Sequence, residues 1–155
     1  MKKYLKAVVS GLCAAALALG CVGCGGASQT AKPAQVTNIT VWTYYNGDQL
    51  ESFTKLVDKF NETVGAQKGI VVSTESQGSV NDLEQSVMDA AEGKVGAAAM
   101  PNIFSAYADT AYALDQLGMV VDLAPYLTDD EKVQFIDGYL SEGDFADNGS
   151  VKIFP

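Results

Sequence analysis

The sequence has 155 residues, of which 48% are apolar and 19% are charged. These values are typical of one globular domain, and they exclude both a disordered chain and two domains of ordinary size. The formal net charge is −9, and neither His nor Arg occurs, so the chain lacks the basic surface that nucleic-acid binding requires and the His that Ser-His-Asp and Cys-His catalysis require.

The N-terminus has the pattern of a secretory signal. Residues 1–6 carry the positive charge, and residues 7–19 form an apolar run that is too short to span a bilayer comfortably. A stretch rich in Gly and Cys follows, and its small residues before Cys resemble a bacterial lipobox. We therefore expect residues 1–23 to be a lipoprotein signal peptide.

Cys24 is the predicted site of lipidation, because Gly23 precedes it and two Gly residues follow. Cys21 is the alternative, and an ordinary cleaved signal with incidental cysteines is another. Diacylglycerol and palmitate on Cys24 would hold the protein on the extracellular face of the cytoplasmic membrane, because two acyl chains anchor stably where one does not. Residues 24–37 are polar and aperiodic, which predicts a flexible tether before an α/β domain at residues 38–155.

The first predicted elements of this domain are a strand and an amphipathic helix. Residues 38–44 are β-branched and aromatic, as in a strand. Apolar residues then recur at steps of three and four, which predicts a helix that ends near Val64. Asp48 and Glu51 have the spacing of a capping box at its start.

A second strand and a second helix follow. Residues 69–74 form a run of continuous apolar character, which predicts a strand covered on both faces. Ser79 and Asp82 have the spacing of another capping box, and the apolar residues behind them predict a helix that ends near Gly93.

The third unit repeats this order. Residues 102–106 are an uncharged, largely apolar run behind a Pro, which predicts a buried strand. Apolar spacing predicts a helix over residues 110–117, and Gly118 stands where a helix needs a left-handed C-terminal residue. Residues 119–121 then begin another extended run.

The last part of the domain contains weaker signals. Residues 122–127 are expected to be a loop or a single turn, Thr128 and Glu131 predict a further helix start, and the polar turn from Gly143 leads to the beginning of a strand at Val151. Three successive strand and helix units predict a parallel, right-handed α/β sheet with flanking helices.

The order of residues 100–123 is Pro-Asn-Ile-Phe, an aromatic residue and an acid, a short helix closed by Leu-Gly, and Val-Val-Asp-Leu. It resembles the extracellular solute-binding proteins of ABC importers, above all the carbohydrate-binding group that includes the maltose-binding proteins. That family usually has Pro-Asp where Asn102 stands. The resemblance covers the whole sequence but only the front part of the family's normal length, and it implies the first, truncated lobe of a two-lobed clamshell.

Candidate ligand contacts lie in the three loops that follow the predicted strands, because the carboxyl ends of parallel strands meet at one edge of a sheet. Aromatic rings offer flat faces to the C–H faces of a sugar, and carboxylates and amides bind its hydroxyls. The predicted ligand-binding residues are Tyr44, Tyr45, Asn46, Gln77, Ser79, Tyr107 and Asp109. In the family, the first of these loops and the acid at the position of Asp109 contact sugar, but the frequent Trp before that acid is missing here.

Each of these residues also has a structural interpretation. Asp109 could cap the helix at Thr110 instead of accepting a bond from a ligand. Only one of Tyr44 and Tyr45 can easily point into a cleft, because adjacent strand residues face opposite ways. Ser79 could serve only as a helix cap, although a helix N-terminus could also hold an anion.

The predicted function is that of a substrate-binding protein that captures a solute, with sugar preferred, and delivers it to the transmembrane subunits of an ABC permease. We predict no enzymatic activity, no cofactor and no metal site, since Asp144–Gly149 is better interpreted as a turn than as a calcium loop. Two alternatives are a structural or adhesive surface lipoprotein and a surface hydrolase, for which no nucleophile or carboxylate pair is found.

Overall fold

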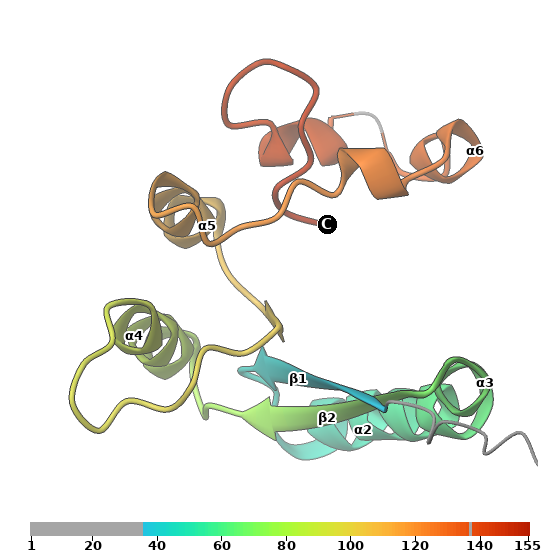
Figure 1. Ribbon diagram of the computed structural model, residues 1–155, viewed down its shortest axis with the longest axis vertical. Helices are drawn as coiled ribbons and strands as arrows, with labels where there is room; N and C mark the ends of the chain where they lie inside the picture. The colour runs from blue at the N-terminus through green and yellow to red at the C-terminus, as the bar shows by residue number, and fades with distance from the viewer. Residues whose placement is uncertain (1–35, 137) are drawn as a thin grey trace, which may run out of the picture. The chain divides into compact units, whose positions relative to one another are not determined.

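A computed structural model describes residues 36–136 and 138–155. The predicted signal peptide, the lipidation site at Cys24 or Cys21, and most of the predicted tether lie outside the described residues. Three parallel strands form a sheet in the order β2-β1-β3, with bounds Thr37–Thr43 for β1, Ile70–Ser76 for β2 and Ile103–Phe104 for β3 (Figure 1). The predicted parallel α/β sheet is confirmed.

The helices alternate with these strands. Helix α2 (Gly47–Phe60) continues through the π-helical turn η1 (Asn61–Gly65) into α3 (Ala66–Lys68). The other α-helices are α4 (Val80–Ala91), α5 (Ala108–Gln116) and α6 (Asp129–Lys132). The described residues also contain two 3-10 turns, η2 (Ala124–Tyr126) and η3 (Leu140–Gly143). No helix in residues 36–136 and 138–155 is long and apolar enough to cross a membrane.

Helix α2 begins two residues earlier than the sequence predicts, and the predicted capping box at its start is wrong. Asn46 is the N-cap residue, and its side chain makes no capping bond. Glu51, the second member of the predicted box, pairs instead with Lys55 one turn along the helix. The helix also continues beyond Val64, because η1 and α3 carry it to Gly69, whose φ of 68° ends it.

Strand β2 is covered on one face only, so the prediction that both faces are covered is wrong. Burial alternates along the strand, and Val71 is 46% exposed. The strand register places Val71 and Glu75 on the same face as Trp42 of β1. Helices α4 and α5 pack over Trp42 rather than over β2, which lies at the edge of the sheet.

The outer edge of β2 is occupied by an asparagine. Asn61, the first residue of η1, accepts the Val72 N–H through Oδ1 and donates to the Val72 carbonyl through Nδ2, both at 2.8 Å. A side-chain amide therefore takes the place of a neighbouring strand at this position, and the backbone groups of Val72 are satisfied.

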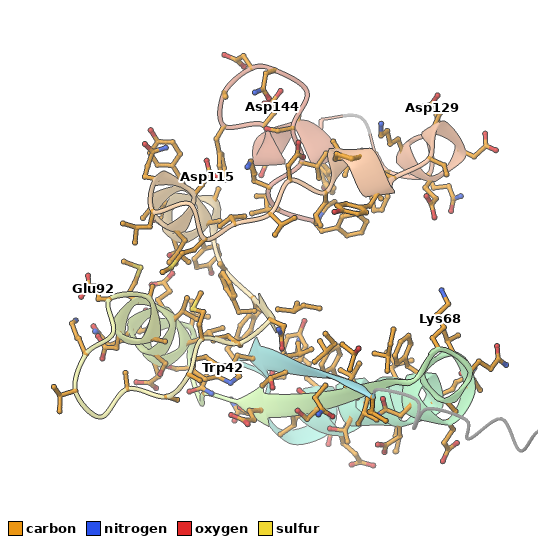
Figure 2. The ribbon with its side chains drawn as sticks, in the orientation of Figure 1. Trp42, Lys68, Glu92, Asp115, Asp129 and Asp144 are labelled. Atoms are coloured by element: carbon orange, nitrogen blue, oxygen red, sulfur yellow. The ribbon has the colours of Figure 1, made fainter. Side chains whose placement is uncertain are left out.

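The core lies where the sheet meets α4 and α5. Trp42, Leu83, Val87 and Leu114 form a cluster in which no residue is more than 3% exposed. Figure 2 labels Trp42 of this cluster. Each such side chain stabilises the fold by roughly 1.5–3 kcal/mol. Around it pack Met88, Ala90, Ala91, Met100, Phe104 and Val120.

Strand β3 is shorter and more exposed than predicted. It pairs with β1 over two residues, and Ile103 is 55% exposed. Asn102 adds two hydrogen bonds to β1 just before this short strand. Its Oδ1 accepts the Thr40 N–H at 2.9 Å, and its own backbone N–H donates to the Thr40 carbonyl. The strand is exposed because it is an edge strand with no neighbour on its outer side among the described residues.

The C-terminal segment is held by polar contacts and contains no strand, so the strand predicted to begin at Val151 is wrong. The Val151 N–H donates to Asp122 Oδ1, and the Val151 carbonyl accepts the Leu123 N–H. The Lys152 ammonium lies 3.0 Å from the carboxylate of Asp115 on α5. The capping box of Thr128 is confirmed, but it starts only the single turn of α6.

Candidate functional site

The structure joins the loops that follow β1 and β2. Asn46 donates from Nδ2 to the Tyr44 carbonyl and, across to the second loop, to the Gly78 carbonyl. The Ser76 hydroxyl donates to the Tyr45 carbonyl at 2.7 Å. Asn46 therefore braces the two loops, and its amide hydrogens are occupied by the protein itself.

The two adjacent tyrosines of the first loop differ in their surroundings. The ring of Tyr45 packs edge-on against Phe53 of α2, with the ring centroids 5.4 Å apart, and is partly buried. Tyr44 contacts Tyr45 at a centroid distance of 5.2 Å but remains 37% exposed. Tyr44 is therefore the tyrosine of this loop that can offer a ring face to a ligand.

The second loop serves mainly to begin α4. Ser79 is the N-cap residue, and its hydroxyl accepts the Asp82 N–H at 3.1 Å and donates to the Asp82 carboxylate at 2.6 Å. Gly78 has a φ of 90°, which favours glycine at this turn. Gln77 donates its N–H to the Thr43 carbonyl, and its side chain is turned toward a cavity beside Trp42.

In the third loop, Tyr107 and Asp109 are both exposed, and Tyr107 is 64% exposed. Helix α5 begins at Ala108, so Tyr107 is its N-cap residue and Asp109 lies in the first turn. The Asp109 carboxylate accepts the adjacent Thr110 N–H at 2.8 Å. The backbone of this loop is held beside β1 by a bond from the Ser105 N–H to the Trp42 carbonyl. Among the described residues, no hydrogen bond links Asp109 to the first two loops.

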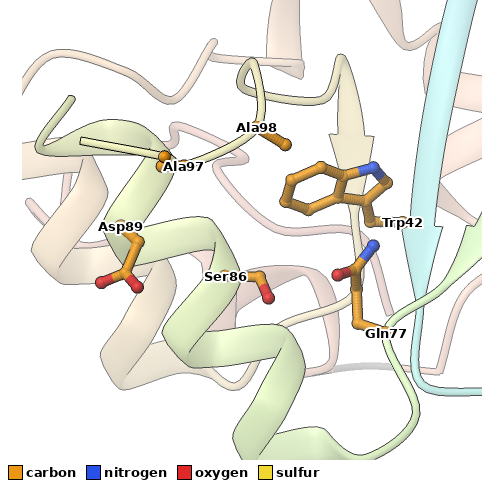
Figure 3. Close-up of a pocket in the computed structure, with 7 residues that line it drawn as sticks. Trp42, Gln77, Ser86, Asp89, Ala97 and Ala98 are labelled. Carbon is orange, nitrogen blue, oxygen red and sulfur yellow. The ribbon is translucent and has the colours of Figure 1, made fainter. Parts of the chain in front are cut away.

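A cavity of about 220 Å³ lies between β1, α4 and the chain that leads to β3 (Figure 3). Its lining is formed by Trp42, Gln77, Ser86, Asp89, Gly96, Ala97 and Ala98. The sequence does not predict this cavity, and among its lining residues only Gln77 is a predicted ligand contact. The feature of the sequence that indicates the cavity is the spacing of Ser86 and Asp89, which lie three residues apart and therefore on the same face of α4.

The charged wall of this cavity is stabilised by an ion pair. The Lys94 ammonium lies 2.6 Å from Asp89 and 3.1 Å from Glu92. The Lys94 ammonium lowers the pKa of the Asp89 carboxyl below its ordinary value, and the Asp89 and Glu92 carboxylates raise the pKa of Lys94. Asp89 is therefore ionised at neutral pH.

The described residues include no group of three or more His, Cys, Asp or Glu side chains placed to hold a metal ion. The Asp144 carboxylate, which begins the acidic turn near the C-terminus, accepts the backbone N–H groups of Asn148 and Gly149, and these bonds lower its pKa. The Asp144 carboxylate oxygens therefore stabilise a turn.

Comparison with known proteins identifies the fold. No protein-family model and no curated protein matches the sequence. Among solved structures, a cyclic α-maltosyl-1,6-maltose binding protein from Arthrobacter globiformis matches 75% of this chain with 21% identity and a TM-score of 0.60. A family 1 extracellular solute-binding protein from Bifidobacterium longum subsp. infantis matches 77% with 16% identity and a TM-score of 0.53.

A structure solved with mannotriose bound matches 76% of the chain with 18% identity and a TM-score of 0.54. The chain spans about 27% of the length of each of these three neighbours. These similarities show that the chain has the fold of part of an extracellular solute-binding protein, and the predicted fold is confirmed. The neighbours are binding proteins rather than enzymes.

Proposed function

We propose that this chain is the first lobe of a substrate-binding protein that captures carbohydrate outside the cell and delivers it to an ABC permease. One observation carries the proposal: at the carboxyl edge of a sheet shared in fold with sugar-binding proteins, Asn46 braces two loops while Tyr44 and Asp109 remain exposed. This edge is where ligands lie in open α/β sheets.

The exposed groups have the chemistry that sugar recognition requires. The Tyr44 ring can pack against the C–H face of a pyranose, and the Asp109 carboxylate can accept bonds from two hydroxyls. The ligand would lie between this lobe and a second lobe. Closure of the two lobes would then shift the population toward the state that the permease recognises, with no covalent step.

The proposal includes a lipid anchor at Cys24, with Cys21 as the alternative, on the extracellular face of the cytoplasmic membrane. The N-terminal sequence pattern supports it, since a charged segment, an apolar run and a Gly-Cys motif follow one another. An anchor of this kind would keep the binding protein close to the permease.

The function is tested with the protein produced from its complete gene, by thermal shift and calorimetry against maltose-, xylose- and mannose-based oligosaccharides. Asp109→Ala should weaken sugar binding by about 10- to 100-fold, because a hydrogen bond to a charged group is worth about 1.5–3 kcal/mol. Asp130→Ala is the matched control, since Asp130 is also an exposed Asp in the first turn of a helix, α6.

Two results would count against the proposal in different ways. If no sugar raises the unfolding temperature of the wild-type protein, carbohydrate capture is wrong and a structural or adhesive role is favoured. If sugar binds and Asp109→Ala has the same affinity as Asp130→Ala, the protein captures sugar but Asp109 lies outside the site.

A further inference from the structure

We propose that Asn148 and Gly149 form a site of spontaneous deamidation, at which the folded chain promotes conversion of Asn148 to aspartate or isoaspartate. The two residues lie in the acidic turn at residues 144–149, to which the proposed function gives no role. The inference therefore stands independently of carbohydrate binding.

The reaction needs water and no other reactant. The Gly149 nitrogen attacks Cγ of Asn148 and gives up its proton as the new N–C bond forms. The bond from Cγ to Nδ2 then breaks, and ammonia leaves with that proton. Water opens the cyclic imide at either of its carbonyls, so that position 148 carries a carboxylate in place of the amide. Because glycine has no Cβ, the approach of its nitrogen to Cγ is open.

The sequence contains a second Asn-Gly pair, Asn46 and Gly47, which the structure holds differently. Asn46 is bonded through Nδ2, the nitrogen that would leave, because Nδ2 donates to the Tyr44 and Gly78 carbonyls. Its ψ of 163° sets an extended backbone directly before α2. Both bonds must break before ammonia can leave, so we expect Asn46 to react slowly in the folded protein.

Asn148 is bonded through the opposite atom of its amide. Its Oδ1 accepts the Ser150 N–H at 3.0 Å, whereas its Nδ2 forms no hydrogen bond with another described residue. Negative charge develops on Oδ1 as the Gly149 nitrogen attacks, and a backbone N–H that already points at this oxygen stabilises the charge. Asn148 and Gly149 are both exposed, so water reaches the imide and ammonia can leave.

Asp144, which is labelled in Figure 2, supplies the proton acceptor. Its Oδ2 accepts the Gly149 N–H at 2.7 Å, and its Oδ1 accepts the Asn148 N–H at 3.1 Å. The attacking nitrogen has to lose its proton, and a carboxylate already bonded to that N–H can take the proton as a general base. One turn therefore places a base on the nucleophile and a donor on the oxygen that becomes negative.

The conversion would loosen the chain that follows the turn. Ser150 and Val151 are 7% and 6% exposed, and the Ser150 hydroxyl donates to the same Asp144 carboxylate at 3.1 Å. A new carboxylate at position 148 repels Asp144, and isoaspartate also adds a methylene group to the main chain, which displaces the Gly149 N–H. Amide hydrogen exchange at Val151 should therefore become faster in the converted protein.

The test compares the two Asn-Gly pairs in the protein produced from its complete gene. Peptide mapping by mass spectrometry at neutral pH follows the gain of about 1 Da at each position over time, in the folded protein and in guanidinium chloride. Position 148 should convert at least about tenfold faster than position 46 in the folded protein, and the two rates should converge in denaturant. An equal or slower rate at position 148 in the folded protein would overturn the proposal. A difference that persists in denaturant would also overturn it, because the local sequence and not the fold would be the cause.

Asp144→Asn tests the proton acceptor. Because the pKa of the Asp144 carboxyl is lowered, this carboxylate is a weak base, and its loss should slow conversion at position 148 by about tenfold. Asp147→Asn is the matched control, since Asp147 is an exposed acid of the same turn whose side chain forms no hydrogen bond with a described residue. Equal rates at position 148 in the two variants would show that the turn does not promote the reaction. The comparison of positions 148 and 46 in the wild-type protein decides the proposal if Asp144→Asn does not fold.

Discussion

Asn46 shows how one side chain can determine the geometry of a candidate site. Its two amide hydrogens are used by the Tyr44 and Gly78 carbonyls, which belong to different loops. Although the sequence predicts Asn46 as a ligand contact, the structure shows it as a brace between the loops that would present Tyr44. The direct contact with a ligand stays a prediction.

Asn46→Asp should separate these roles. The substituted carboxylate cannot donate to the two carbonyls, so we expect a loss of about 1 kcal/mol in the free energy of unfolding and weaker sugar binding. Denaturant unfolding and calorimetry measure the two effects. Asn38→Asp is the control, because Asn38 lies exposed on β1 and its side chain forms no hydrogen bond with a described residue. Equal free energies of unfolding for Asn46→Asp and Asn38→Asp would show that the two hydrogen bonds of Asn46 do not stabilise the fold.

At the scale of elements, the sheet depends on a helix for one of its edges. The π-helical turn η1 follows α2 directly and starts with Asn61, whose amide binds both backbone groups of Val72. A helix and an edge strand are thus joined by the same pair of bonds that two strands would share.

Asn61→Ala should therefore cost roughly 1–3 kcal/mol in the free energy of unfolding, because it leaves the Val72 N–H and carbonyl without partners. Denaturant unfolding measures this cost, and amide hydrogen exchange at Val72 should become faster. Gln67→Ala on α3 removes a side-chain amide that is exposed and has no such bond, and it should leave both measurements unchanged. An unchanged exchange rate at Val72 in Asn61→Ala would contradict this role.

The C-terminal segment has a different kind of link, which depends on pH. The backbone N–H groups of Val151 and Ala124 lower the pKa of the Asp122 carboxyl below its ordinary value of 3.8. Because the pKa of the Asp122 carboxyl is lower in the folded state, the stabilisation by these two hydrogen bonds is complete above pH 3.8. It is lost as the pH falls through the lower pKa of the folded state.

In an NMR titration, the Val151 and Ala124 amide signals should therefore move together with the Asp122 carboxyl signal, with a midpoint below pH 3.8. In Asp122→Asn these two amide signals should no longer follow a carboxyl titration. A midpoint at or above 3.8 in the wild-type protein would mean that the two bonds do not hold the segment.

At the scale of the whole molecule, periodicity predicts which elements form but not which of their faces are covered. The strands, the three main helices and the helix end at Gly118, whose φ is 71°, follow from apolar spacing and glycine chemistry. The open face of β2 does not, because a run such as Ile-Val-Val looks the same in a central strand and in an edge strand.

The candidate site is predictable to a similar degree. Placing ligand contacts in strand-exit loops follows from the parallel sheet, but the bond from Asn46 to Gly78 joins residues 32 positions apart and has no local pattern. The cavity beside Trp42 also depends on a long connection, from Ala91 to Ile103, whose course no periodicity determines.

The proposed lipid anchor belongs to this scale as well. In cells that produce the complete gene, Cys24→Ser should move most of the protein from the membrane fraction into the medium, whereas Cys21→Ser should leave it in the membrane fraction. Fractionation and intact mass determination measure both outcomes. Release by Cys21→Ser alone would assign the anchor to Cys21, and an intact mass of the wild-type protein without a diacylglyceryl group would rule out the anchor.

The two outer strands of the sheet differ in what they leave open. Asn61 occupies the outward backbone groups of Val72 on β2, whereas β3 pairs over two residues and leaves Ile103 55% exposed. A strand edge whose outward backbone groups are already bonded pairs less readily with another strand. A further strand, from the same polypeptide or from another copy, is therefore expected to pair beside β3 more readily than at Val72 of β2.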